Sequence, residues 1–265
     1  MPLVAAVLCL SPTLAWAQNR DVEEIVNAKD KVARFSISTG FDLSTGHYGD
    51  PDKTDIVVVP VSLRYRANDW LSIGAAMPWI RINGPDVVLG PDNRPLPGFP
   101  IARQVRSGVG DLSLSTTVSV PTGDTSPWLV DLTGRVKLPT AAKSNGLTTG
   151  KLDVSASVEV SYVIGKWVPS LELGMRFPGS PAGINLRNSV AVSAGATRIL
   201  KKGALIATYD YERSFSPFSA DSHSLFGAYV RPVAKRVDVT GYGIAGLSKG
   251  APAIEAGLLV TIKLD

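Results

Sequence analysis

The most informative stretch of the sequence runs from Trp128 to Phe177, where apolar and polar positions alternate. From Leu152 to Tyr162 every second residue is apolar or aromatic, and the residues between them are Asp, Ser or Glu. Strict alternation gives an extended strand one apolar and one polar face. The same pattern occupies 128–139 and 167–178, and Gly165-Lys166 forms a tight turn before the last run. The segment therefore predicts three consecutive antiparallel strands.

The length of these strands favours a membrane barrel. Strands of soluble sandwiches usually end after about 5–6 residues, and the alternation here continues well beyond that length. A membrane barrel turns its apolar face to lipid and its polar face to a lumen. A soluble periplasmic β protein is the alternative, but it could not expose a continuous apolar band. We therefore predict an all-β, transmembrane, antiparallel up-and-down β-barrel.

The rest of the chain divides into further runs of the same kind, about twelve in all. Connections after even-numbered runs are short, and those after odd-numbered runs are mostly longer. Bacterial outer-membrane barrels have an even strand number, short periplasmic turns and longer outer loops, so this order supports that class. The predicted strands cover 34–43, 54–66, 70–82, 109–120, 128–139, 150–164, 167–178, 187–200, 204–214, 223–232, 236–247 and 253–264.

Four tryptophans fit the same scheme. Trp70, Trp128 and Trp167 each begin an odd-numbered run directly after a short turn, and Trp79 falls near the opposite end of its run. Aromatic residues gather at the edges of a membrane. We therefore predict that these four form a membrane-interface girdle. The alternative is that they are core aromatics of a soluble protein.

Several segments resemble one family of bacterial outer-membrane proteins. The more specific pair is DLTGRVKLPT (131–140) followed by GLTTGKLD (146–153). Weaker matches are TDIVVVPVSLRY (54–65), RSGVGDLSLS (106–115), LRN (186–188) and YDY (209–211). Over nearly the whole mature chain, the sequence is similar to the family associated with the MetA-pathway of phenol degradation. The resemblance implies an outer-membrane β-barrel that moves small compounds, aromatic ones among them.

The C-terminal end departs from the usual pattern of such barrels. Outer-membrane barrels generally end on an aromatic residue, which the barrel-assembly machinery reads. Here Leu264 takes that place and Asp265 follows it. We still expect the assembly machinery and outer-membrane lipid as partners, because the alternation continues through the last strand.

The alternation assigns a set of charged side chains to the lumen. A two-residue turn at Gly165-Lys166 places Glu159 opposite Glu172, where like charges repel. Arg135 and Lys137 on the preceding strand are candidates to balance them. Two interpretations remain open: a salt-bridge network that braces the wall, or a charged band that selects solutes. The predicted lumen charges are Arg64, Arg66, Asp131, Arg135, Lys137, Asp153, Glu159, Glu172, Arg176, Asp210, Glu212, Asp238 and Lys263.

The longest predicted connection, 83–108, contains five prolines. Long loops in compact domains are usually functional or disordered, and Pro-rich sequence is semi-rigid. The loop either folds inward and narrows the pore or lies outside as a surface flap.

Residues 1–17 are predicted to be a secretory signal peptide, with an apolar stretch before Ala15-Trp16-Ala17. Residues 18–33 are polar and predict a periplasmic extension, either with one short helix or as a frayed terminus. The barrel would occupy 34–265. The only cysteine is Cys9, so the mature chain would have no disulfide.

Composition limits the other function classes. The formal net charge is +4 with a sequence pI of about 9.2, and the excess forms no basic stripe with aromatics, so nucleic-acid binding has little support. No apolar run reaches the roughly 18 residues of a spanning helix.

Candidate catalytic or metal-binding residues are few. Asp50, Asp52 and Asp55 do not make a complete Ca²⁺ loop, because Pro51 and Lys53 interrupt them and no bidentate Glu follows. The only histidines, His47 and His223, have no Cys partner for zinc. A hydrolase would need a Ser–His pair, and the sequence has no GxSxG elbow. We predict no catalytic residue, metal or cofactor, but a passive channel for small solutes, the alternative being a non-conducting structural or partner-binding barrel.

Overall fold

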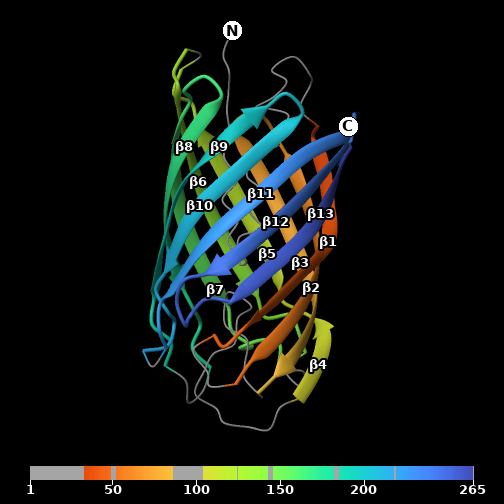
Figure 1. Ribbon diagram of the computed structural model, residues 1–265, viewed down its shortest axis with the longest axis vertical. Coiled ribbons are helices and arrows are strands. Elements are labelled where there is room, and N and C mark those ends of the chain that lie inside the picture. The colour runs from red at the N-terminus through yellow and green to blue at the C-terminus, as the bar shows by residue number, and fades with distance from the viewer. Residues whose placement is uncertain are drawn as a thin grey trace.

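The chain forms a closed β-barrel (Figure 1). The computed structural model describes residues 33–48, 52–85, 104–123, 125–142, 146–181, 185–217 and 219–264. The strands of these residues are β1 (Phe35–Gly46), β2 (Thr54–Arg66), β3 (Leu71–Gly84), β4 (Gln104–Val109), β5 (Leu112–Val120), β6 (Trp128–Leu138), β7 (Asp153–Tyr162), β8 (Trp167–Phe177), β9 (Ser189–Leu200), β10 (Gly203–Glu212), β11 (Ser222–Ala234), β12 (Val237–Gly246) and β13 (Ile254–Leu264).

Consecutive strands pair antiparallel, with the exception of β4 and β5, and the first and last strands close the barrel. At the seam Phe35 lies opposite Leu264 on one side and opposite Tyr65 on the other. Closure gives β1 and β13 a partner on both sides, so the wall has no open seam, which is what a β-structure in lipid requires. β4 and β5 both pair with β3 and together act as one wall strand, so the barrel has twelve strands, as predicted.

The division of that wall strand corrects one sequence-based boundary. The prediction placed a strand at 109–120 after a loop covering 83–108. Instead, β3 continues to Gly84 and pairs with β4, and the strand breaks between β4 and β5. At the break Gly110 N–H bonds the Pro78 carbonyl at 2.8 Å, and Asp111 is buried. Residues 86–100 lie outside the described residues, so whether this loop folds inward or outward stays a prediction.

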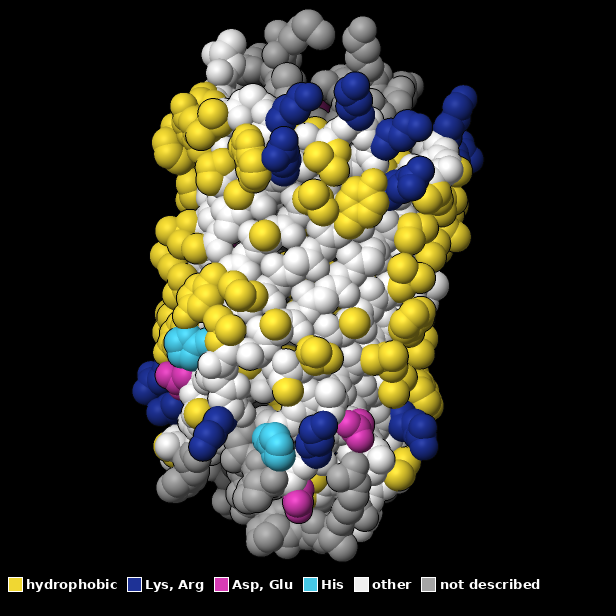
Figure 2. All heavy atoms as spheres, viewed as in Figure 1, with side chains coloured by type: hydrophobic (Ala, Val, Ile, Leu, Met, Phe, Trp, Pro, Cys, Tyr) yellow, Lys and Arg dark blue, Asp and Glu magenta, His cyan; other side chains and the backbone are white. Residues whose placement is uncertain are grey.

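Alternation along each strand gives the barrel an apolar exterior. Large side chains such as Phe41, Leu171 and Leu225 are almost half exposed, whereas the residues between them are buried or half-buried. Figure 2 shows hydrophobic side chains over the middle of the wall and charged ones gathered at its two ends. This arrangement suits a wall surrounded by lipid. Among the described residues, no helix is long and apolar enough to cross a membrane.

The two ends of the barrel differ in the length of their connections. Residues 163–166, 201–202 and 235–236 join strands at one end, where β13 also finishes. The longer connections 139–152, 178–188, 213–221 and 247–253 lie at the other end. We call these the turn end and the loop end.

Candidate functional site

The lumen is lined on one side by a polar wall, which we define as the inward side chains of β5–β9. Its inward positions are mainly Ser, Thr and charged residues because the strands alternate strictly. Thr117 and Thr133, for example, share a hydrogen bond of 3.0 Å between neighbouring strands. Small hydroxyl side chains leave room in the lumen, and they can form hydrogen bonds with one another between neighbouring strands.

Three acids form a row across the polar wall. Asp131 of β6 lies opposite Glu159 of β7, which lies opposite Glu172 of β8. The register between the two glutamates is the one that the turn predicted, and Ile164 pairs with Trp167 beside it. Asp131 and Glu159 are buried, and the Ser161 hydroxyl donates to Glu159 at 3.2 Å. The row concentrates negative charge at one level of the lumen.

A basic row lies nearer the loop end. Arg135 of β6 and Arg176 of β8 both lie opposite Ser155 of β7. Arg135 lies four positions after Asp131, about 13 Å along an extended strand. Arg176 Nη1 also contacts Glu212 Oε1 of β10 at 2.8 Å. On β6 and on β8, acidic and basic side chains therefore occupy different positions along the same strand.

Lys137 balances a different pair of acids from the one that the sequence suggested. Its Nζ lies 2.7 Å from Asp153 Oδ2 and 3.3 Å from Asp111 Oδ2. It was a candidate partner for the two glutamates, but it lies on the other side of the basic row. Asp111 sits at the break between β4 and β5, which the sequence analysis placed within a strand, so its role was missed.

The other predicted lumen residues also lie on inward positions. Arg64 and Arg66 of β2 are half-buried, and Arg64 Nη2 donates to the Ser72 hydroxyl at 3.2 Å. Asp210 accepts from the Ser193 hydroxyl at 2.5 Å. Asp238 and Lys263, 2.7 Å apart, form a pair. The structure distributes the predicted charges over several levels, and it brings only some of them together.

An apolar patch covers part of the opposite lumen wall, and the sequence analysis did not identify it. The Phe226 and Tyr242 ring centroids are 6.0 Å apart, and the Tyr242 hydroxyl donates to Asp42 at 2.7 Å. Every second residue of β10–β13 points inward, as elsewhere, and over part of these strands the inward residues are aliphatic or aromatic. The apolar patch comprises Ala204, Ile206, Phe226, Ala228, Val230, Tyr242, Ile244 and Leu259.

The 139–152 connection reaches the inner face of the barrel at the loop end. Leu147 is buried against Ile80 and Ile82 of β3, and Tyr48, Ile56 and Val58 complete the cluster. Since these β2 and β3 side chains occupy inward positions, Leu147 lies on the lumen side of the wall at the loop end.

Polar contacts hold this connection in place. Asp111 accepts from the Thr148 hydroxyl at 2.6 Å and from Ala141 N–H at 3.0 Å. Arg106 Nη1 donates to the Gly146 carbonyl at 3.3 Å. Together with Lys137, these contacts anchor the inward-folded connection to β4–β6.

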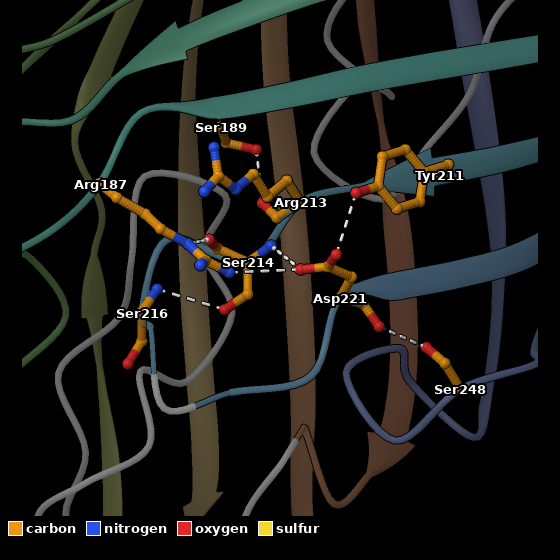
Figure 3. A network of polar contacts seen from close by, with 8 residues as sticks. All are labelled: Arg187, Ser189, Tyr211, Arg213, Ser214, Ser216, Asp221 and Ser248. Carbon is orange, nitrogen blue, oxygen red and sulfur yellow. Dashed lines mark hydrogen bonds and ion pairs between the residues drawn. The ribbon is translucent and has the colours of Figure 1, made fainter.

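A second polar network ties three loop-end connections together (Figure 3). Asp221 accepts from Ser214 N–H and the Tyr211 hydroxyl, each at 2.9 Å, and from Arg187 Nη2 at 3.4 Å. The Ser248 hydroxyl donates to the Asp221 carbonyl at 2.7 Å. Burial alone would raise the pKa of Asp221, but these hydrogen bonds and the nearby arginines hold that pKa below its ordinary value.

The four predicted girdle tryptophans are all on the outside. Trp70, Trp128 and Trp167 are about half exposed and lie at the turn end, whereas Trp79 lies along β3 toward the loops. The Trp167 ring is 5.0 Å from the Arg198 guanidinium carbon. Within the described residues, no group of three His, Cys, Asp or Glu is arranged to hold a metal ion.

Comparison with known proteins gives the fold. The sequence matches no family model and no curated protein. Among solved structures, an outer-membrane channel from Pseudomonas putida F1 is similar, with a TM-score of 0.70 at 14% identity, over 89% of this chain and 97% of that one. The KdgM porin in complex with oligogalacturonate gives a TM-score of 0.54 at 8% identity, over 87% and 99%.

The translocator domain of the autotransporter NalP from Neisseria meningitidis gives a TM-score of 0.53 at 10% identity, over 92% of both chains. Identities this low establish the architecture and leave the solute open. The chain therefore has the fold of the bacterial outer-membrane β-barrels.

Proposed function

We propose that the chain is an outer-membrane channel for the passive uptake of small solutes. The observation that carries the proposal is the closed barrel itself, which is apolar outside and bears ionisable side chains at several levels inside. Buried charges in a wall are costly unless they are paired or serve a function. A polar lumen surrounded by an apolar exterior supplies a path for solutes across lipid.

The lumen also bears on the class of solute. The polar wall offers hydroxyl and charged groups, while the apolar patch offers Phe226 and Tyr242 for contact with aromatic rings. A small aromatic acid has a carboxylate that suits the polar wall and a ring that suits the apolar patch. Such solutes also agree with the resemblance to the family associated with phenol degradation.

A second candidate is a non-conducting barrel with a structural or partner-binding role. Burial of the lumen favours it, because Asp131, Asp153 and Glu159 are each less than a tenth exposed. The burial of Leu147 on the lumen side at the loop end also favours a non-conducting barrel. In that case the salt bridges of the polar wall would only brace the barrel.

Planar-bilayer recording of the refolded mature protein distinguishes the two. We expect discrete openings whose current is reduced by added benzoate, and a smaller effect of acetate at equal concentration. A shift in gel mobility on heating would show that the sample is a folded barrel. A folded barrel that never opens would overturn the channel proposal and favour the structural role.

Membrane insertion would use the barrel-assembly machinery. Leu264 holds the position generally occupied by an aromatic residue, and its neighbour across the seam is Phe35, whose ring stacks on Tyr65 with centroids 4.7 Å apart. The expected defect in Leu264→Asp is reduced assembly in cells, whereas Leu264→Phe should assemble at least as well as the wild type.

A further inference from the structure

The turn end carries a basic collar, a cluster of Lys and Arg on one part of its circumference. Figure 2 shows Lys and Arg side chains gathered there, at the top of the view. All its members are exposed, and they belong to β9, β11 and the turns that join β7 to β8, β9 to β10 and β11 to β12. The basic collar consists of Lys166, Arg198, Lys201, Lys202, Arg231, Lys235 and Arg236.

Acidic residues are few in the described segments that carry the collar. Within 163–169, 197–206 and 229–239 the only acid is Asp238, which faces inward and pairs with Lys263. The other two turns, 67–69 and 121–127, contain one Asp each and no Lys or Arg. Arg34 and Arg66 lie beside the 67–69 turn, but they do not form a cluster of the size of the collar. The positive charge is therefore concentrated in the collar, and it does not follow from the small net charge of the chain.

The collar lies at the level of a membrane interface. Arg198 and Arg231 occupy outward strand positions, and Arg198 rests over the Trp167 ring. The Tyr229 hydroxyl donates to the Lys202 carbonyl at 3.1 Å, which holds the 201–202 turn against β11. Trp and Tyr mark the headgroup region of membrane proteins. The cations are thus held beside aromatic anchors, where phosphate groups of lipids would lie.

We propose that the basic collar binds anionic phospholipid headgroups, such as phosphatidylglycerol, in the periplasmic leaflet. Short turns of bacterial barrels face the periplasm, and clustered Lys and Arg near a membrane surface attract anionic lipid. Several cations on adjacent turns would enrich such lipids around this part of the barrel. The proposal rests on the proposed membrane location but not on conduction, so a conducting channel without lipid preference would overturn it alone.

Tryptophan fluorescence can test the proposal within one molecule. A variant that keeps only Trp167 reports on the collar, and one that keeps only Trp70 reports on the part of the same rim outside the collar. Each is reconstituted in vesicles of brominated phosphatidylglycerol mixed with phosphatidylcholine, and quenching gives the relative lipid affinity. We expect about a tenfold preference for phosphatidylglycerol at Trp167, weakened by salt, and none at Trp70. Equal affinity at both sites would overturn the proposal.

Charge substitutions provide the matched control. Lys201→Gln, Lys202→Gln and Lys235→Gln together should remove most of the preference at Trp167. Lys53→Gln, Lys151→Gln and Lys249→Gln change the net charge equally at the loop end and should leave it unchanged. Retention of the preference in the first triple variant would contradict a role for the collar.

Thiol labelling in cells tests which side of the outer membrane the collar faces. Lys202→Cys introduces a thiol at the turn, and Cys9 is the only cysteine in the natural sequence. A membrane-impermeant maleimide should label this thiol only after the outer membrane is opened. Labelling in intact cells would place the collar in the outer leaflet, against lipopolysaccharide, and would overturn the proposal.

Discussion

The polar wall and the apolar patch are built from strands of the same length and pairing, yet they are stabilised by different interactions. On the polar wall, Lys137 joins two acids of neighbouring segments and Thr117 bonds Thr133. On the apolar patch, Phe226 packs beside Tyr242 among aliphatic side chains. The polar wall therefore depends on charges that must remain paired, whereas the apolar patch depends on area removed from water.

The largest effect is expected where a buried charge loses its partner. Lys137→Met leaves Asp111 and Asp153 without their cation and should destabilise the barrel by about 3–5 kcal/mol. It should also loosen the anchored 146–149 segment. Denaturant unfolding in detergent micelles measures the change. Lys151→Met, at an exposed site beside the same connection, is the control and should change stability by less than about 0.5 kcal/mol.

Loss of packing in the apolar patch should come next. Phe226→Ala removes a buried ring and should destabilise the barrel by about 3 kcal/mol. Since the ring lies on the lumen side, the single-channel current should also rise. Phe226→Leu keeps most of the volume and should show a smaller change in both quantities. Equal effects of the two substitutions would mean that packing does not stabilise this wall.

A change of ion selectivity is expected from the acidic row. Glu159→Gln with Glu172→Gln removes two neighbouring negative charges and should shift the reversal potential in a salt gradient toward anions. Asp210→Asn, on another strand, is the comparison for one charge outside the row. If selectivity stays unchanged in the double variant, the row only braces the wall.

The smallest effect is expected at the loop-end network outside the lumen. Arg187 and Asp221 are each about a third exposed, so Asp221→Asn should cost less than about 1 kcal/mol. Because the folded pKa of Asp221 is lowered, its contribution is present above the unfolded value of about 3.9. The contribution is lost as the pH falls through the lower folded pKa. Thermal unfolding of wild type and variant should therefore converge at strongly acidic pH.

The polar wall could be predicted from sequence because each of its strands alternates. Leu152 to Tyr162 fixes which residues face inward, and the Gly165-Lys166 turn fixes the register of Glu159 and Glu172. A strict alternation and a tight turn together are enough to predict the inward residues and the register of neighbouring strands. The strand boundaries agree with the prediction to within a few residues for most of the barrel.

The apolar patch could not be predicted in the same way. Around Phe226 and Ile206 the outward neighbours Leu225 and Leu205 are also apolar, so the two faces do not differ in polarity. The inward-folded connection was missed for another reason. Thr148 binds Asp111 across 37 positions of sequence, and no local pattern reports such a contact.

Cysteine accessibility during single-channel recording tests most directly whether both lumen surfaces line a path open to solutes. Thr133→Cys lies on the polar wall, Ala228→Cys on the apolar patch, and Ala207→Cys on an outward position of β10. A small charged thiosulfonate added to the bath should reduce the current of the first variant. A neutral benzyl reagent should reduce that of the second, and the third should not respond. Full current in both lumen variants after treatment would contradict a path lined by the polar wall and the apolar patch.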